Sequence, residues 1–221
     1  MAYILSIETA TTNCSVSISF KGEQIALKED NNKQYSHAER LHLYINDVLK
    51  QAKIDTKTLD AISVSKGPGS YTGLRIGVSA AKGLCYALDI PLLSIPTLEV
   101  LAHSIQIKDG YIIPIIDARR MEVYSAVYDE KYSCIESTCA TVLDKLSFKN
   151  LIERKQVYFV GNATKKTEST LKQSNAKFIN QLPSASQMCL MSFQKFILKQ
   201  YEDVAYFEPF YLKDFISFSS K

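Results

Sequence analysis

Apolar and polar residues alternate over the first part of the chain, and this alternation predicts a set of adjacent strands. The run 3–9 is mostly apolar, 15–20 alternates hydrophobic residues with serines, and 24–28 follows a Lys-Gly turn. Period-two alternation bounded by turn residues is typical of strands with one buried face. We therefore expect a three-stranded antiparallel meander at the N-terminus.

The spacing of apolar residues then changes to three and four, which predicts a helix over 36–53. A short apolar strand over 59–65 and a Gly-rich loop lead into a second helix, 70–88. This second helix is rich in Gly, Ala and Ser, although each interior Gly costs about 1 kcal/mol relative to Ala. We expect another helix to pack closely on it.

The opening pattern returns in the second half of the chain. A shift of 109 positions places Ile4 on Ile113, Ile7 on Ile116 and Glu8 on Asp117. The repeat predicts two related lobes, 1–108 and 109–221, and the alternative is a chance likeness of two hairpins. The second lobe opens with strands at 111–117 and 122–128 and continues with fewer recognisable elements.

Three further elements and an aromatic tail follow. We expect a helix at 146–154, a strand at 157–160 and a helix at 186–202. The segment 206–215 holds five aromatic residues, which would be costly to leave in water. We expect part of it to pack on the body of the protein or on a partner.

Composition excludes several classes of protein. The 221 residues are 46% hydrophobic and carry a formal net charge of +3, which is too small for strong RNA binding by the chain alone. Five cysteines without a C-x-x-C pair argue against a zinc site, and His37 and His42 face different sides of a helix. Because no apolar run is long enough to span a membrane and no leader is evident, we expect a cytoplasmic protein.

The Gly-rich loop is the first candidate for chemistry. Gly67 and Gly69 join a strand to a helix, where backbone amides could face an anion. No Lys follows Gly73, as a P-loop requires, and the G-x-G-x-x-x-G spacing is one residue too long for the dinucleotide fingerprint. A phosphate contact and a tight turn with close helix packing both remain open.

Two hairpin tips carry carboxylates. Glu8, Thr9 and Thr11 form a polar tip, and Asp117 lies at the corresponding tip of the second lobe. The first tip resembles the hairpin tip that holds phosphate in actin-like ATPases. Asp117 could also pair with the Arg119 guanidinium or simply stabilise the turn. No G-x-S-x-G or H-E-x-x-H motif occurs, so hydrolase and peptidase functions are disfavoured. The possible nucleotide or phosphate contacts are Glu8, Thr9, Thr11, Gly67, Gly69 and Asp117.

Several segments resemble one known family. The segment 65–77, SKGPGSYTGLRIG, resembles the G-P-G-S-[FY]-T-G-[LV]-R-[IV]-G signature of the TsaB (YeaZ) proteins. Weaker likenesses lie at 7–16 (I-D-T-A-T…C-S-V-A), 36–41 (H-[ST]-x-x-L), 116–124 (I-D-A-R…E-V-Y) and 209–213 (P-x-Y-L-[RK]). The resemblance covers most of the chain and is thin between about 130 and 205.

The resemblance implies an α/β, two-lobed actin-like ATPase (ASKHA) fold with a reduced second lobe. It also implies a non-catalytic scaffold that supports TsaD, the enzyme that adds threonylcarbamoyl to adenosine 37 of tRNA to give t6A37. TsaD holds a metal with an H-x-x-x-H pair, and the matching positions here are Thr97 and Leu101, which cannot bind one.

Partners follow from the same resemblance. They are TsaD, the ATPase TsaE and a second copy of the chain, with tRNA reached only through the complex. No cofactor is expected on the chain by itself, and ATP or ADP with magnesium belongs to the complex. The alternative is a nucleotide-binding or phosphotransfer enzyme of the actin-like class. The expected partner-binding positions are Leu41, Ile45, Val48, Leu74, Gly77, Ala80, Ala81, Gly83 and Leu84.

Overall fold

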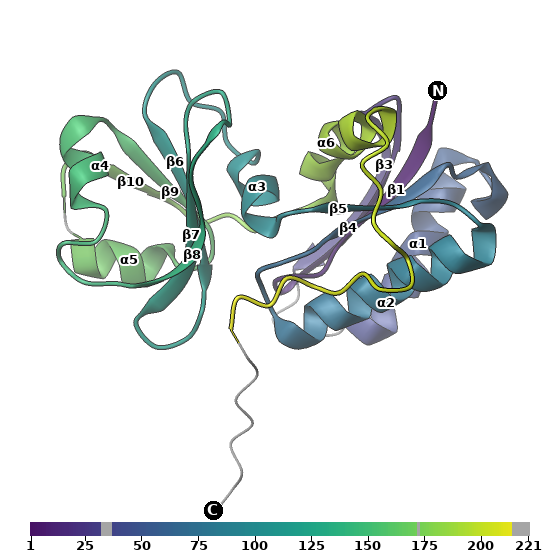
Figure 1. Cartoon of the computed structure of the whole chain (residues 1–221), viewed down its shortest axis with the longest axis horizontal. Coiled ribbons are helices and arrows are strands. Elements are labelled where there is room, and N and C mark those ends of the chain that lie inside the picture. Colours follow the sequence, from purple (N-terminus) through teal and green to yellow (C-terminus); the bar gives the residue numbers. More distant parts are fainter. Residues whose placement is uncertain (32–36, 172, 214–221) are drawn as a thin grey trace, which may run out of the picture.

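Two five-stranded sheets, side by side, organise the chain (Figure 1). A computed structural model describes residues 1–31, 37–171 and 173–213. The first sheet has the order β3-β2-β1-β4-β5, and its first three strands form the expected antiparallel meander. Its strands are β1 (Tyr3–Glu8), β2 (Asn13–Phe20), β3 (Glu23–Asn31), β4 (Ala61–Ser65) and β5 (Leu92–Ile95).

Helices cover both faces of the first sheet, because side chains along β1 alternate between the faces. Leu5 and Ile7 pack with α1 (His37–Ala52) and α2 (Tyr71–Leu88), whereas Ile4 packs with Phe193 and Phe196 of α6 (Ala185–Ile197). Figure 1 shows α6 on the opposite side of this sheet from α1 and α2. The short elements η1 (Thr56–Thr58) and α3 (Thr97–Ala102) precede β4 and β6.

The second sheet repeats the topology of the first, in the order β10-β9-β6-β7-β8. Ile4 of β1 pairs in parallel with β4, and Ile113 of β6 pairs in parallel with β9, as the internal repeat predicts. The strands are β6 (Tyr111–Asp117), β7 (Glu122–Tyr128), β8 (Cys134–Val142), β9 (Val157–Val160) and β10 (Ala176–Ile179). The reduction lies in the helices, since α4 (Lys149–Arg154) and α5 (Thr164–Leu171) are much shorter than α1 and α2.

The predicted second lobe, 109–221, needs correction. Helix α6 ends at Ile197, short of the expected 202, and it packs on the first sheet. Its buried residues Met188 and Met191 join Ile95 and Val100 in one cluster. The chain therefore leaves the first lobe for the second sheet, 111–179, and returns to the first lobe.

The segment 198–213 runs over the first lobe and ends beside the second (Figure 1). Lys82 Nζ of α2 donates to the carbonyls of Ala205 and Phe207, both at 3.0 Å. Lys213 then forms an ion pair with Glu122 of β7. Part of the aromatic tail thus packs on the body of the protein, while residues 214 and 215 lie outside the described residues.

No helix in the described part of the chain is long and apolar enough to cross a membrane.

Candidate functional site

The tip of the first hairpin presses directly on the Gly-rich loop. Thr9 Oγ1 donates to the Gly73 carbonyl at 2.8 Å, and the Ser70 amide donates to the Ala10 carbonyl at 2.7 Å. A Cβ at Gly69 would lie 2.5 Å from the Ala10 oxygen, and one at Gly73 would lie 2.1 Å from the Thr9 oxygen. These glycines permit two backbone segments to touch. Of the predicted site residues, Thr9 lies against Gly73, and Gly69 lies against Ala10, the neighbour of Thr9.

Several amides of the loop donate hydrogen bonds within the chain. The Gly67 amide donates to Thr97 Oγ1 at 3.1 Å, and the Gly73 amide donates to Ser70 Oγ at 3.3 Å. Gly67 has φ +109, and the Phe210 amide of the tail donates to the Lys66 carbonyl at 2.7 Å beside it. The Gly67 amide thus ties the loop to α3, and the Lys66 carbonyl ties it to the tail.

Glu8 is fully buried at the end of β1. Its Oε1 accepts from the Ala10 amide at 2.6 Å, while Oε2 has no hydrogen-bond partner among the described residues. Burial raises the pKa of Glu8, whereas the Ala10 amide and the nearby Ser65 hydroxyl lower it. Burial is the largest effect, and the resulting pKa is about 7. The third residue of the tip, Thr11, is also buried, and its carbonyl lies 2.7 Å from His37 Nε2.

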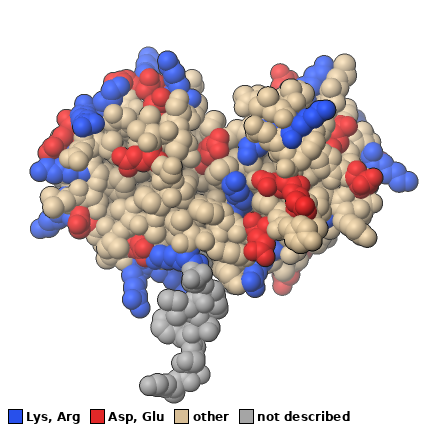
Figure 2. Space-filling view, in the orientation of Figure 1, with Lys and Arg blue, Asp and Glu red and all other residues tan. Residues whose placement is uncertain are grey.

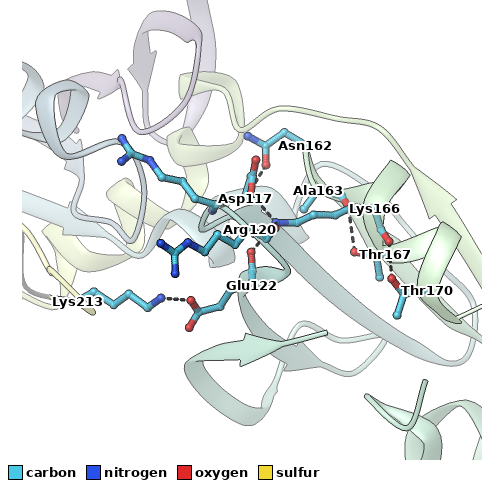
Figure 3. A network of polar contacts seen from close by, with 10 residues as sticks. Asp117, Arg120, Glu122, Asn162, Ala163, Lys166, Thr167, Thr170 and Lys213 are labelled. Atoms are coloured by element: carbon cyan, nitrogen blue, oxygen red, sulfur yellow. Dashed lines mark hydrogen bonds and ion pairs between the residues drawn. The ribbon is translucent and has the colours of Figure 1, made fainter. Parts of the chain in front are cut away.

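Asp117 has a different environment, shown in Figure 3. It is exposed and forms an ion pair with Lys166 Nζ at 2.5 Å. The proposed pair with the Arg119 guanidinium is wrong, because it is the Arg119 backbone amide that donates to Asp117 Oδ1, at 2.9 Å. Asp117 therefore stabilises its turn, and Lys166 neutralises its charge.

Two features of the first hairpin tip are unfavourable for a nucleotide held with magnesium. Burial holds the pKa of the Glu8 carboxyl near neutrality, and Thr9 and Ala10 fill the space directly beside Gly73 and Gly69. Within the described ranges, no three His, Cys, Asp or Glu side chains are grouped closely enough to hold a metal ion.

Most of the expected partner-binding positions face inward, which corrects that interpretation. They form the buried side of α1 and α2 and pack in the chain's own core, so they cannot contact a partner directly. Ala80 and Leu84 are half-buried, and only Gly83 is exposed; a Cβ added to Gly83 would lie in open space, with no packed atom within 4 Å. The buried positions are Leu41, Ile45, Val48, Leu74, Gly77 and Ala81.

The outer face of α1 and α2 is formed by different residues. Tyr86 is 87% exposed and Leu43 is 61% exposed, although both are large apolar side chains. Arg75 and Ser79 lie exposed on the same helix as Gly83. This face could have been predicted from the sequence as the side of each helix opposite its apolar stripe. We call the face formed by Leu43, Arg75, Ser79, Gly83 and Tyr86 the outer helix face.

Comparison with known proteins agrees with this architecture. The profile of the TsaD family, described as tRNA N6-adenosine threonylcarbamoyltransferase, matches residues 31–216. The Bacillus subtilis "tRNA threonylcarbamoyladenosine biosynthesis protein TsaB" is 38% identical over 133 residues, which are 60% of this chain and 58% of that protein. The match thus spans less than two thirds of that relative. The protein of the same name from Buchnera aphidicola subsp. Schizaphis graminum is 32% identical over 184 residues, 80% of this chain and 87% of the relative.

Solved structures give the same fold. YeaZ from Pseudomonas aeruginosa superposes with a TM-score of 0.84 at 24% identity, over 96% of this chain and all of that one. The actin-like component A of the Acidaminococcus fermentans (R)-2-hydroxyglutaryl-CoA dehydratase superposes with a TM-score of 0.52 at 12% identity, over 88% and 99% of the two chains. The fold is therefore the expected two-lobed actin-like one, and the chain belongs to the TsaB (YeaZ) family.

Proposed function

We propose that the chain is a non-catalytic subunit of t6A37 biosynthesis that binds and supports a TsaD-type threonylcarbamoyltransferase. A TsaE-type ATPase would join the same assembly. The names of the Bacillus and Buchnera relatives support the pathway. The observation that carries the scaffold role is the outer helix face, where Gly83 leaves open space beside the exposed Tyr86.

The surroundings of the matched metal positions support a role without catalysis. The Thr97 hydroxyl accepts a hydrogen bond from the Gly67 amide, and Leu101 is completely buried in the core. Neither side chain offers a ligand to a metal ion. Glu8 is enclosed, so the carboxyl at the first hairpin tip cannot reach a substrate.

The chemistry of the outer helix face supports docking of another helix. Burying an exposed aromatic ring contributes strongly to association, and a glycine next to it lets a partner helix approach the backbone. The TsaD profile covers most of this chain, so a TsaD-type partner has a related fold and presents comparable helices. A second copy of the chain could use the same face, and the two pairings would then compete.

Co-elution tests the proposal. The purified chain is mixed with a TsaD-type protein and passed over a sizing column, with and without a TsaE-type protein and ATP. A stable complex is expected. Absence of any complex under both conditions would overturn the scaffold role.

Calorimetry with ATP and magnesium tests the alternative, an actin-like nucleotide-binding or phosphotransfer enzyme. The lone chain is expected to give no binding, because Thr9 and Ala10 occupy the space beside Gly69 and Gly73. Micromolar affinity would favour the enzyme.

A further inference from the structure

Two neighbouring arginines occupy the turn between β6 and β7. Arg119 and Arg120 are both exposed, and neither guanidinium has an ion pair or hydrogen bond with any described residue. The carboxylates beside them are already neutralised, Asp117 by Lys166 and Glu122 by Lys213. The turn therefore carries two unpaired positive charges.

The backbone beneath these side chains is held firmly. Lys166 Nζ donates to the carbonyls of Arg120 at 3.1 Å and Glu122 at 2.6 Å, in addition to its ion pair with Asp117. The Glu122 amide donates to the Arg119 carbonyl at 3.1 Å. Figure 3 shows the Arg120 side chain extending away from Lys166, on the side from which Lys213 approaches. Because the backbone of this turn is already ordered, little backbone entropy is lost when the side chains bind a ligand.

Arginine is an unfavourable residue for this backbone. Arg119 has φ 69 and Arg120 has φ 48, which lie in the left-handed region that Gly and Asn adopt most easily. Strained positions of this kind concentrate at functional sites. The turn itself would favour Gly or Asn at these positions, so a role of the guanidinium groups explains why arginine is present.

We propose that Arg119 and Arg120 bind the phosphate backbone of the RNA substrate when the chain is part of its assembly. The inference rests on the proposed function, which supplies an RNA to the complex. Guanidinium groups match phosphate oxygens in pairs, and phosphate contacts position a nucleic acid without reading its sequence. With a net charge of +3 the chain binds RNA weakly alone, so the contact acts within the complex. In Figure 2, Lys and Arg atoms gather on the underside of the second lobe.

The test measures tRNA binding to the complex of this chain with a TsaD-type protein at several salt concentrations. The variant is Arg119→Asn with Arg120→Gly, which suits the left-handed backbone and preserves folding. The control removes two positive charges at the other end of the same strands, by Lys108→Ala with Lys131→Ala; both lysines are exposed.

The arginine variant is expected to bind tRNA about 5- to 20-fold more weakly near physiological salt, with a salt slope smaller by one to two phosphate contacts. The control is expected to resemble the unchanged chain, and melting temperatures are expected not to fall. Equal affinity and slope for the arginine variant and the unchanged chain would overturn the inference, as would an equal loss in the control.

Complex formation by sizing column separates this inference from the proposed function. If no complex forms with the unchanged chain, the scaffold role fails. If the complex forms but the arginine variant alone disrupts it, the turn contacts a protein and the RNA inference is overturned.

Discussion

Thr9 and Gly73 hold the first hairpin against α2 so closely that no side chain fits between them. Thr9 Oγ1 donates to the Gly73 carbonyl at 2.8 Å, and a Cβ on Gly73 would stand 2.1 Å from the Thr9 carbonyl oxygen. The most distinctive motif of the sequence is thus a packing contact between two backbones.

Gly73→Ala is expected to destabilise the chain by at least about 2 kcal/mol, because backbone atoms must move to admit the methyl group. Urea unfolding measures the change. Gly83→Ala is the matched control in the same helix, where open space and better helix propensity predict a gain of up to about 1 kcal/mol. Equal effects of the two changes would mean that close packing at Gly73 is unimportant.

The raised pKa of Glu8 is expected to make the stability of the protein fall as pH rises. Burial raises its pKa from 4.5 to about 7, so the folded state favours the protonated form. The stabilisation is fully present below pH 4.5 and is lost as pH rises to about 7. Since one pKa unit is worth about 1.4 kcal/mol, the loss amounts to roughly 3 kcal/mol.

Glu8→Gln cannot ionise, so the variant is expected to gain stability relative to the unchanged chain as pH rises from 4.5 to 8. Urea midpoints across this range measure the difference. Glu23→Gln, at an exposed position, is expected to run parallel to the unchanged chain. A constant difference between Glu8→Gln and the unchanged chain would show that the folded-state pKa of Glu8 is not raised.

Phe207 anchors the C-terminal segment to the first lobe. It packs against the main core, whereas its neighbour Tyr206 is 85% exposed. Phe207→Ala is expected to cost roughly 1–2 kcal/mol and to speed proteolytic cleavage between 198 and 213. Limited proteolysis with mass spectrometry follows the cleavage, and Tyr206→Ala should leave it unchanged. Equal cleavage rates in both variants would mean that the segment is held by other contacts.

The fold was predictable where the hydrophobic pattern was regular. The meander, both long helices and the paired strands 111–117 and 122–128 follow from local periodicity and are confirmed. Strand β8, Cys134–Val142, was missed because it is an edge strand with mostly exposed residues and no apolar alternation. Helix α5, Thr164–Leu171, gave no apolar stripe because two of its three buried residues are Thr164 and Thr167.

Long-range packing was not predictable from local pattern. The return of α6 to the first sheet depends on contacts between Met188 or Met191 and residues far away in the sequence. On α1, the periodicity identified Leu41 and Ile45 correctly as one stripe, but a stripe marks the core face. The surface left for a partner is the opposite one, and only the structure shows which residues line it.

Docking through the outer helix face is tested by the affinity of this chain for a TsaD-type protein, measured by calorimetry for the unchanged chain and two variants. Gly83→Arg places a long charged side chain on the outer helix face. Gln194→Arg places the same group at an exposed position of α6, on the other side of the first sheet. Gly83→Arg is expected to lose affinity at least about tenfold with an unchanged melting temperature, and Gln194→Arg is expected to lose none. Unchanged affinity for Gly83→Arg would contradict docking through this face.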